Sequence, residues 1–251
     1  MRVKLVLSGG AARGIAHIGV LKALEELGVD VIRVSGVSAG ALVGAFYCSG
    51  YTPEEMLKIV KSKDWLKTIR PRVPKYGLFS FSRAERFLRE HLEIERIEQL
   101  TKKLYICVLD IKSGKTFYFD SGELYPLLLG SCALPGIFEP VRYRDHLLVD
   151  GGITNNLPVE PLLNTEGLLV GVDVNPTNSM ENVRSIAHII IRSFLLAVRS
   201  NVDKRKELCH IIIEPKLQGF STIDLWKADE LYKAGYIEAK RVIGSYVKAH
   251  H

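Results

Sequence analysis

Residues 34–41 are Val34-Ser35-Gly36-Val37-Ser38-Ala39-Gly40-Ala41, and they join two different patterns. The apolar run before them, Val31 to Val34, predicts a buried strand, and Ala39 to Tyr47 predict the start of a helix. A serine between a strand and a helix, with glycines two residues before and after it, is typical of a nucleophile elbow. Gly36 and Gly40 leave room on a sharp turn where a Cβ would strike neighbouring backbone. We therefore predict that Ser38 projects from the edge of a sheet.

The composition favours one large globular unit. The chain has 251 residues, of which 47% are hydrophobic and 25% charged, and no stretch resembles a linker. This predicts a single domain over residues 1–251. A formal charge of +6 favours anionic partners. No apolar run is long enough to span a membrane and no signal peptide is evident, so we expect a cytoplasmic protein. The scattered cysteines predict free thiols and no metal site.

The first 34 residues predict a βαβ unit. Val3 to Leu7 has the pattern of a buried strand, and the glycine-rich loop from Ser8 to Gly14 leads into a helix that ends at Gly28. Because the next strand begins at Val31, the two strands should be parallel, and the loops that follow them should open at the same sheet edge. This places the glycine-rich loop beside Ser38.

Such a loop suits acyl transfer. Negative charge develops on the carbonyl oxygen when a serine attacks an ester, and preorganised backbone N–H groups stabilise that charge. The predicted donors of this oxyanion hole are Gly9, Gly10, Ala11 and Ala12. Arg13 and Gly14 are predicted to support the loop; Arg13 either binds an anionic headgroup or forms a salt bridge that holds the loop.

Residues 51–100 are predicted to be a helical insertion beside the sheet. Thr52 and Pro53 open one helix and Ser82 caps another. Between them, residues 56–75 combine many basic side chains with Trp65 and several aliphatic residues. This combination predicts either a peripheral contact with an anionic membrane or a partly buried helix face, and favours neither reading. Nucleic acid is not an expected partner.

The rest of the chain completes an α/β pattern. Further strands are predicted at 104–109, 116–119, 147–149, 168–172 and 211–213, and further helices at 124–134, 183–198 and 228–246. The helix at 183–198 should be largely buried. The short strand at 147–149 delivers Asp150 into Asp150-Gly151-Gly152, where the two glycines let the carboxylate reach a crowded site.

The residues alone do not identify the base that activates Ser38. A triad in the chain order of the α/β-hydrolases would use Asp173 and His210, but His210 begins a strand and should lie at the opposite sheet edge. Asp150 is the alternative, acting directly on a serine 112 residues earlier. Asp110 and Asp173 are rival acids because each of them also follows a strand.

Three motifs in this order resemble the patatin-like phospholipase family of bacteria. They are Gly9-Gly10-Ala11-Ala12-Arg13-Gly14, Gly36-Val37-Ser38-Ala39-Gly40 and Asp150-Gly151-Gly152, and the segment from Ser131 to Pro140 resembles the family's stretch before its aspartate. The resemblance implies a three-layer α/β/α fold with a mainly parallel sheet, a lipid acyl hydrolase, and a dyad of Ser38 as nucleophile and Asp150 as base. It implies no cofactor and no requirement for calcium. Ala11 and Ser8 depart from the glycine and aspartate that many members have.

Two other hypotheses remain. The glycine-rich loop, with Asp30 about twenty residues further on, weakly resembles a dinucleotide-binding turn, although its spacing differs from G-x-G-x-x-G. The chain also suits a regulatory or lipid-binding module that keeps the fold and has little esterase activity. The sequence gives no prediction of the oligomeric state.

Overall fold

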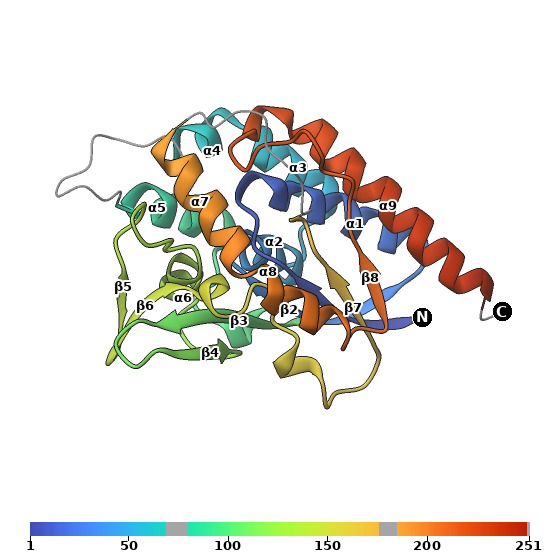
Figure 1. Cartoon of the computed structure of the whole chain (residues 1–251), viewed down its shortest axis with the longest axis horizontal. Helices are drawn as coiled ribbons and strands as arrows, with labels where there is room; N and C mark the ends of the chain where they lie inside the picture. Colours follow the sequence, from blue (N-terminus) through green and yellow to red (C-terminus); the bar gives the residue numbers. More distant parts are fainter. Residues whose placement is uncertain (69–79, 176–184, 250–251) are drawn as a thin grey trace.

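The computed structural model describes residues 1–68, 80–175 and 185–249. An eight-stranded mixed sheet runs through them, with helices packed on it (Figure 1). The strands are β1 (Arg2–Leu7), β2 (Asp30–Val37), β3 (Lys103–Asp110), β4 (Lys115–Phe119), β5 (Val141–Tyr143), β6 (His146–Asp150), β7 (Leu168–Val172) and β8 (Ile211–Ile213). Strands β8, β7, β1, β2 and β3 are successive parallel neighbours, whereas β4, β5 and β6 are added antiparallel.

Helices and short 3₁₀ turns connect the strands of this sheet. The α-helices are α1 (Ile15–Glu26), α2 (Ala39–Cys48), α3 (Pro53–Lys61), α4 (Lys63–Thr68), α5 (Ser82–Leu92), α6 (Leu124–Ser131), α7 (Ile186–Ala197), α8 (Arg199–Lys206) and α9 (Ala228–Ala249). Short 3₁₀ turns are η1 (Ala11–Gly14), η3 (Ile97–Gln99), η4 (Gly151–Ile153), η5 (Glu160–Leu162) and η6 (Leu225–Lys227). The described part of the stretch from 51 to 100 contains α3, α4, α5 and η3.

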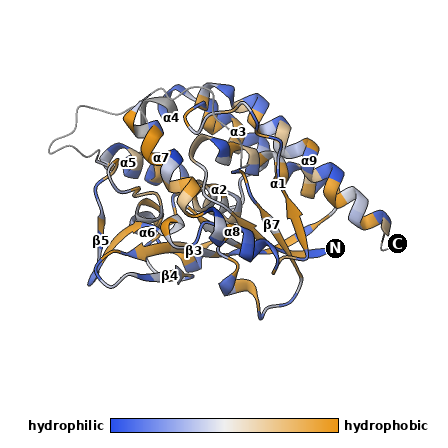
Figure 2. Ribbon diagram, in the orientation of Figure 1, coloured by the Kyte–Doolittle hydropathy of each residue, from blue (hydrophilic) through white to orange (hydrophobic). Residues whose placement is uncertain are grey.

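The alternation of side chains along β1 shows how the layers form. Val3, Leu5 and Leu7 face the main core, to which helices α1, α2, α6 and α9 also contribute. Val6 faces the other side, where it packs in a smaller core with Val202 of α8. Strands β3 and β7 are accordingly largely hydrophobic, while α9 carries both hydrophilic and hydrophobic residues (Figure 2). The predicted three-layer α/β/α fold with a mainly parallel sheet is confirmed.

Strand β3 brings two distant segments end to end. Cys107 pairs with Val37 of β2 on one edge and with β4 on the other edge. The next residue, Val108, pairs with β4 and also with Asp150 of β6, so β6 lies on the same edge of β3 as β2. Because β2 is parallel and β6 antiparallel to β3, their carboxyl ends meet. The residue after Val37 is Ser38, which therefore lies at the end of β6.

The predicted helix at 183–198 differs from the structure. Residues 183 and 184 lie outside the described part, and α7 is followed directly by a second helix, α8, that the sequence pattern did not predict. The prediction that this helix is largely buried is wrong for one face, because Ile186, Ile189 and Leu196 are exposed. An apolar sequence made the helix look buried on every side. Within the described ranges, no helix has the length and apolar character needed to cross a bilayer.

Helices α1 and α9 contact each other through two glycines. A Cβ at Gly19 would lie 1.9 Å from the carbonyl oxygen of Tyr232, and a Cβ at Gly235 would lie 1.9 Å from that of Ala16. Each glycine therefore lets the backbone of the facing helix approach so closely that a Cβ at this position would collide with it. This contact keeps α1, and with it the glycine-rich loop before it, in place on the sheet.

We expect Gly19→Ala to lower the free energy of unfolding by about 1–3 kcal/mol or more, because the added methyl group meets backbone rather than a side chain that can rotate away. Gly244→Ala is the matched control: it lies in α9 with open space around it. There the higher helix propensity of alanine should stabilise by up to about 1 kcal/mol. Urea unfolding of both variants measures the difference, and equal effects would contradict the proposed contact.

Candidate active site

The turn at Ser38 has the geometry of a strained elbow. Ser38 has φ 53° and ψ −124°, and it caps the N-terminus of α2. Such a backbone conformation costs a non-glycine residue on the order of 1–3 kcal/mol. Two glycines make the turn possible. A Cβ at Gly36 would lie 2.6 Å from the carbonyl oxygen of Gly40, and a Cβ at Gly40 would lie 2.3 Å from that of Leu7.

A buried hydroxyl holds the elbow against the sheet. The Ser38 N–H donates to Ser131 Oγ at 2.8 Å, and Ser131 Oγ donates to the carbonyl oxygen of Cys107 in β3 at 2.7 Å. In the sequence, Ser131 stands out only as the first residue of the segment that resembles the family, and no role was predicted for it. The thiol of Cys132 lies beside the Ser38 side chain, and burial raises its pKa, so the neutral thiol is no rival nucleophile.

Asp150 lies at the end of β6, and the residue is 3% exposed. Its Oδ1 accepts the N–H of Gly152 at 2.8 Å. Burial raises the pKa of Asp150 to about 7, while the hydrogen bonds from Gly152 and from the side chain of Ser38 act in the lowering direction. Gly151 keeps the chain close to β3, since a Cβ there would lie 2.6 Å from the Cys107 oxygen. Ser38 and Asp150 thus meet at one rim of the sheet.

The glycine-rich loop lies against the elbow. A Cβ at Gly9 would lie 3.1 Å from Ser38 Cβ, and a Cβ at Gly14 would lie 2.5 Å from Ala39 Cβ. The N–H of Ala12 is engaged, since it donates to Thr222 O at 3.0 Å. Over the described ranges, no hydrogen bond engages the N–H groups of Gly9, Gly10 or Ala11. Of the four predicted donors, Ala12 therefore has a partner in the protein, and the oxyanion role of Gly9, Gly10 and Ala11 stays a prediction.

Asn156 is a polar side chain that sequence reasoning missed. It is 1% exposed, and neither atom of its amide has a hydrogen-bond partner. Its Oδ1 would lie 2.6 Å from a Cβ at Gly9 and 2.7 Å from a Cβ at Gly152, so the amide lies between the glycine-rich loop and the Asp150 loop. Leaving a buried amide unpaired is costly. The signal in the sequence was a pair of asparagines, Asn155 and Asn156, five and six residues after Asp150 and directly before the apolar Leu157-Pro158-Val159.

Two buried side chains anchor the ends of the glycine-rich loop. His17 Nε2 lies 2.8 Å from the carbonyl oxygen of Ser8, and burial lowers the pKa of His17 to about 4, which keeps the ring neutral. Arg13 donates from Nε and Nη2 to the carbonyl oxygen of Phe220 at 3.0 and 2.7 Å. Desolvation lowers the pKa of Arg13 to about 10, and the guanidinium remains charged. The loop support predicted for Arg13 comes from a carbonyl rather than a salt bridge.

The rival acids have other partners. Asp110 accepts hydrogen bonds from the hydroxyl of Ser113 and from the N–H of Leu147, which lower its pKa and fix the turn into β4. Asp173 is fully buried and paired with Arg199 and Lys206. The chain-order triad fails as well, because His210 accepts the N–H of Leu169 at the start of β7, on the opposite rim from Ser38.

The dinucleotide hypothesis fails on the position of its acid. Asp30 starts β2 in register with Arg2 at the start of β1, so it lies at the far rim from the glycine-rich loop. Its carboxylate is 3.7 Å from the Arg2 guanidinium. A ribose ligand would have to lie beside the loop, at the carboxyl end of the strands.

The basic region is described only in part. Residues 69–75 of the stretch 56–75 lie outside the described ranges, and Trp65 packs on Phe87 with ring centroids 5.3 Å apart. Lys58, Lys61 and Lys63 are exposed, and Lys61 pairs with Asp229 at 2.7 Å. Trp65 therefore belongs to a partly buried face, and Lys58, Lys61 and Lys63 form the exposed part.

The comparison with protein families matches the region that holds the candidate site. The model of the patatin-like phospholipases matches residues 5–163, which include the glycine-rich loop, Ser38, Asp150 and Asn156. The chain belongs to the patatin-like phospholipase family. The resemblance found in the sequence is thereby confirmed.

Patatin-like relatives are found in animals, fungi and bacteria. Patatin-like phospholipase domain-containing protein 6 of Mus musculus is 29% identical over 284 residues, covering 98% of this chain and 21% of the relative. A lysophospholipase of Aspergillus fumigatus is 26% identical over 275 residues, covering 96% of this chain and 18% of the relative. An uncharacterized NTE family protein of Mycobacterium tuberculosis is 34% identical over 180 residues, covering 69% and 49%. The chain thus spans between about a fifth and about half of these relatives.

Among solved structures, VipD from Legionella pneumophila has the same fold. The TM-score is 0.57 at 15% sequence identity, and the alignment covers 97% of this chain and 66% of VipD.

We expect Asp150→Asn to stabilise this patatin-like chain at pH 8. A folded-state pKa raised from 3.8 to about 7 means that stability falls as pH rises from about 4 to 7, since the folded state holds the proton more tightly. Asparagine mimics the neutral carboxyl, so the gain should reach a few kcal/mol above pH 7, at about 1.4 kcal/mol per pKa unit, and should vanish below pH 4. Thermal unfolding of both proteins across pH measures it. A pH-independent difference would contradict the raised pKa.

Proposed function

We propose that the chain is a lipid acyl hydrolase of the phospholipase A, lysophospholipase or carboxylesterase type, with Ser38 as nucleophile and Asp150 as general base. The observation that carries the proposal is the meeting of a strained, accessible serine with a buried carboxyl group whose pKa is raised to about 7. Such a carboxylate is a far stronger base than one in water, and it titrates where a base is useful. Membership of the patatin-like phospholipases and the name of the fungal relative support a lipid ester as substrate.

In the proposed reaction, Asp150 takes the proton of Ser38 as the hydroxyl attacks the ester carbonyl. The N–H groups of Gly9, Gly10 and Ala11 stabilise the oxyanion, and the unpaired amide of Asn156 is available to a polar group of the substrate. The tetrahedral intermediate expels the alcohol, which receives the proton from Asp150, and leaves an acyl-enzyme on Ser38. Water, activated by the same carboxylate, then releases the fatty acid. Each of these steps uses only groups of this chain, the substrate and water.

The alternative is a lipid-binding or regulatory module with little or no esterase activity. The free N–H groups of the glycine-rich loop favour the enzyme, since a module that only binds lipid has no need of oxyanion donors beside a serine.

We expect Ser38→Ala to abolish hydrolysis of a short-chain aryl ester and labelling by a fluorophosphonate probe. Asp150→Asn should lower kcat about 10²–10⁴-fold, the usual contribution of a general base. Asp110→Asn is the matched control and should retain near wild-type activity. Loss of activity in Asp110→Asn or a histidine variant, with Asp150→Asn still active, would overturn the dyad. A folded wild-type protein that neither hydrolyses nor is labelled would favour the lipid-binding module.

The same base sets the pH dependence. Because Asp150 must be deprotonated to accept a proton, kcat/KM should rise about tenfold per pH unit below pH 7 and level off above it. A pH–rate profile on an uncharged ester measures this directly. A midpoint near pH 4 would mean that the catalytic carboxyl is not buried.

We also propose a peripheral contact with anionic membranes, through the lysines of 56–75 and the exposed apolar face of α7. Ile186, Ile189 and Leu196 are 77%, 50% and 51% exposed. The opposite side of α7 reaches the site, since Phe194 Cζ would lie 3.0 Å from a Cβ at Gly152. A helix that contacts the catalytic loop on one side and exposes aliphatic side chains on the other is suited to face the surface where the substrate resides.

Co-sedimentation with vesicles tests this contact. We expect binding to phosphatidylcholine vesicles that contain phosphatidylglycerol, weaker binding at high salt, and at least a several-fold loss in Ile189→Ser. Ile237→Ser is the matched control, because Ile237 is similarly exposed, at 53%, but lies on α9. Equal losses in the two variants, or binding that ignores lipid charge, would contradict the assignment to α7 and the lysines.

A further inference from the structure

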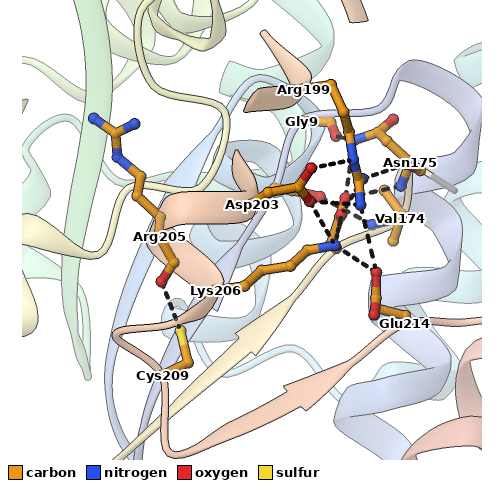
Figure 3. Close-up of polar contacts among 11 residues, drawn as sticks. Gly9, Val174, Asn175, Arg199, Asp203, Arg205, Lys206, Cys209 and Glu214 are labelled. Carbon is orange, nitrogen blue, oxygen red and sulfur yellow. Dashed lines mark hydrogen bonds and ion pairs between the residues drawn. The ribbon is translucent and has the colours of Figure 1, made fainter. Parts of the chain in front are cut away.

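Asn175 connects the glycine-rich loop to a cluster of buried charges. Its Nδ2 donates to the carbonyl oxygen of Gly9 at 2.6 Å, and the residue is 8% exposed. Figure 3 shows Asn175 beside Gly9 and beside Arg199 of α8, and it contacts both. Sequence reasoning gave Asn175 no role, because a single asparagine after a strand carries no motif.

The hydrogen bond to Gly9 determines where the next amide points. In a trans peptide, the C=O of one residue and the N–H of the following residue point in opposite directions. Since the Gly9 C=O points to Asn175, the Gly10 N–H must point away from it. No hydrogen bond within the described ranges engages that N–H. The contact on the Gly9 carbonyl therefore directs the Gly10 N–H away from Asn175, towards the side of the loop opposite the Asp173 cluster.

Gly10 cannot easily take another position. A Cβ there would lie 2.5 Å from Val174 Cγ2 and 3.2 Å from Asn175 Oδ1. The N–H of Val174 in turn donates to Ser8 Oγ at 3.1 Å. The segment after β7 thus contacts the loop at three successive residues, Ser8, Gly9 and Gly10.

Asn175 is itself held on its backbone. Asp173 Oδ1 accepts the Asn175 N–H at 3.0 Å, and Arg199 Nη1 donates to the Asn175 carbonyl oxygen at 2.9 Å. Asp173 is fully buried, and its Oδ2 lies 2.8 Å from Arg199 Nη1 and 2.6 Å from Lys206 Nζ. A buried carboxylate with two cationic partners is rigid, because removing one partner leaves an uncompensated charge. The cluster, and α8 with it, therefore fixes the asparagine.

We propose that Asn175 is a positioning residue for the oxyanion hole, holding the Gly10 N–H in the direction in which a developing oxyanion accepts it. The proposal rests on the acyl hydrolysis proposed above. It assigns a function to the Asp173 cluster that is distinct from proton transfer. Loss of an oxyanion donor costs on the order of 10²–10³ in kcat, and a misdirected donor should cost a substantial part of that.

The test compares Asn175→Ala with Lys4→Met. Lys4 is a 2% exposed donor to the carbonyl oxygens of Leu162 and Thr165, at 2.8 and 2.6 Å, so its loss removes comparable buried bonds away from the loop. We expect Asn175→Ala to lower kcat about 10–100-fold with KM changed less than threefold. A trifluoromethyl ketone, whose adduct with the serine mimics the oxyanion, should bind more weakly to this variant by the same factor. Lys4→Met should lower the melting temperature and leave kcat within twofold.

Two further variants keep the test decisive. Asn175→Asp preserves the size but replaces the donor with an oxygen that repels the Gly9 carbonyl, so it should lose at least as much kcat as Asn175→Ala. Arg199→Lys, which leaves the loop untouched, should show a smaller loss of the same kind. Unchanged kcat in the folded Asn175 variants, or equal losses in Lys4→Met, would overturn the inference alone. A wild-type protein without Ser38-dependent labelling would overturn the proposed function and this inference together.

Discussion

The site depends on one edge of β3 being shared, end to end, by two strands of opposite direction. The ladder from Arg33 to Val37 occupies the first part of that edge, and β6 occupies it from Val108 onward. Backbone hydrogen bonds of the sheet, rather than a flexible loop, therefore set the separation of the nucleophile and the acid. A slip of two residues in β6 would move the carboxylate by about 7 Å, and a slip of one would turn it to the other face.

Around this edge, the site combines features that are unfavourable when taken alone. Ser38 adopts a positive φ, and Asp150 is buried without a cationic partner in the described ranges. The strained backbone of Ser38 and the buried carboxyl group of Asp150 both persist because hydrogen bonds from neighbouring residues hold them. Ser131 holds the elbow amide, and Gly152 donates to the carboxylate. Strain at the nucleophile and desolvation at the acid are thus supported by a rigid sheet, which is the usual relation between a functional site and its scaffold.

The sequence was sufficient for features that depend on local pattern. Strand ends, the elbow with its glycines, and the βαβ unit followed from periodicity and from residues with special backbone conformations. The partner of Ser38 could not be chosen in this way, because the choice depends on which strand lies beside β3 across 112 residues. Asn156 and Asn175 were missed for a related reason. Their importance lies in what surrounds them, an unpaired amide in one case and the Gly9 carbonyl in the other.

The two aspartates at the rim show why position alone could not identify the base. Asp150 and Asp173 both follow strands at the carboxyl edge of the sheet, and both are buried. Asp173 has two cations as partners, Arg199 and Lys206, which compensate its buried charge. Asp150 has backbone and hydroxyl donors only, so burial dominates and its affinity for a proton rises. One carboxylate is thereby suited to hold the scaffold together and the other to accept the proton of Ser38, and the difference comes from the charges around them.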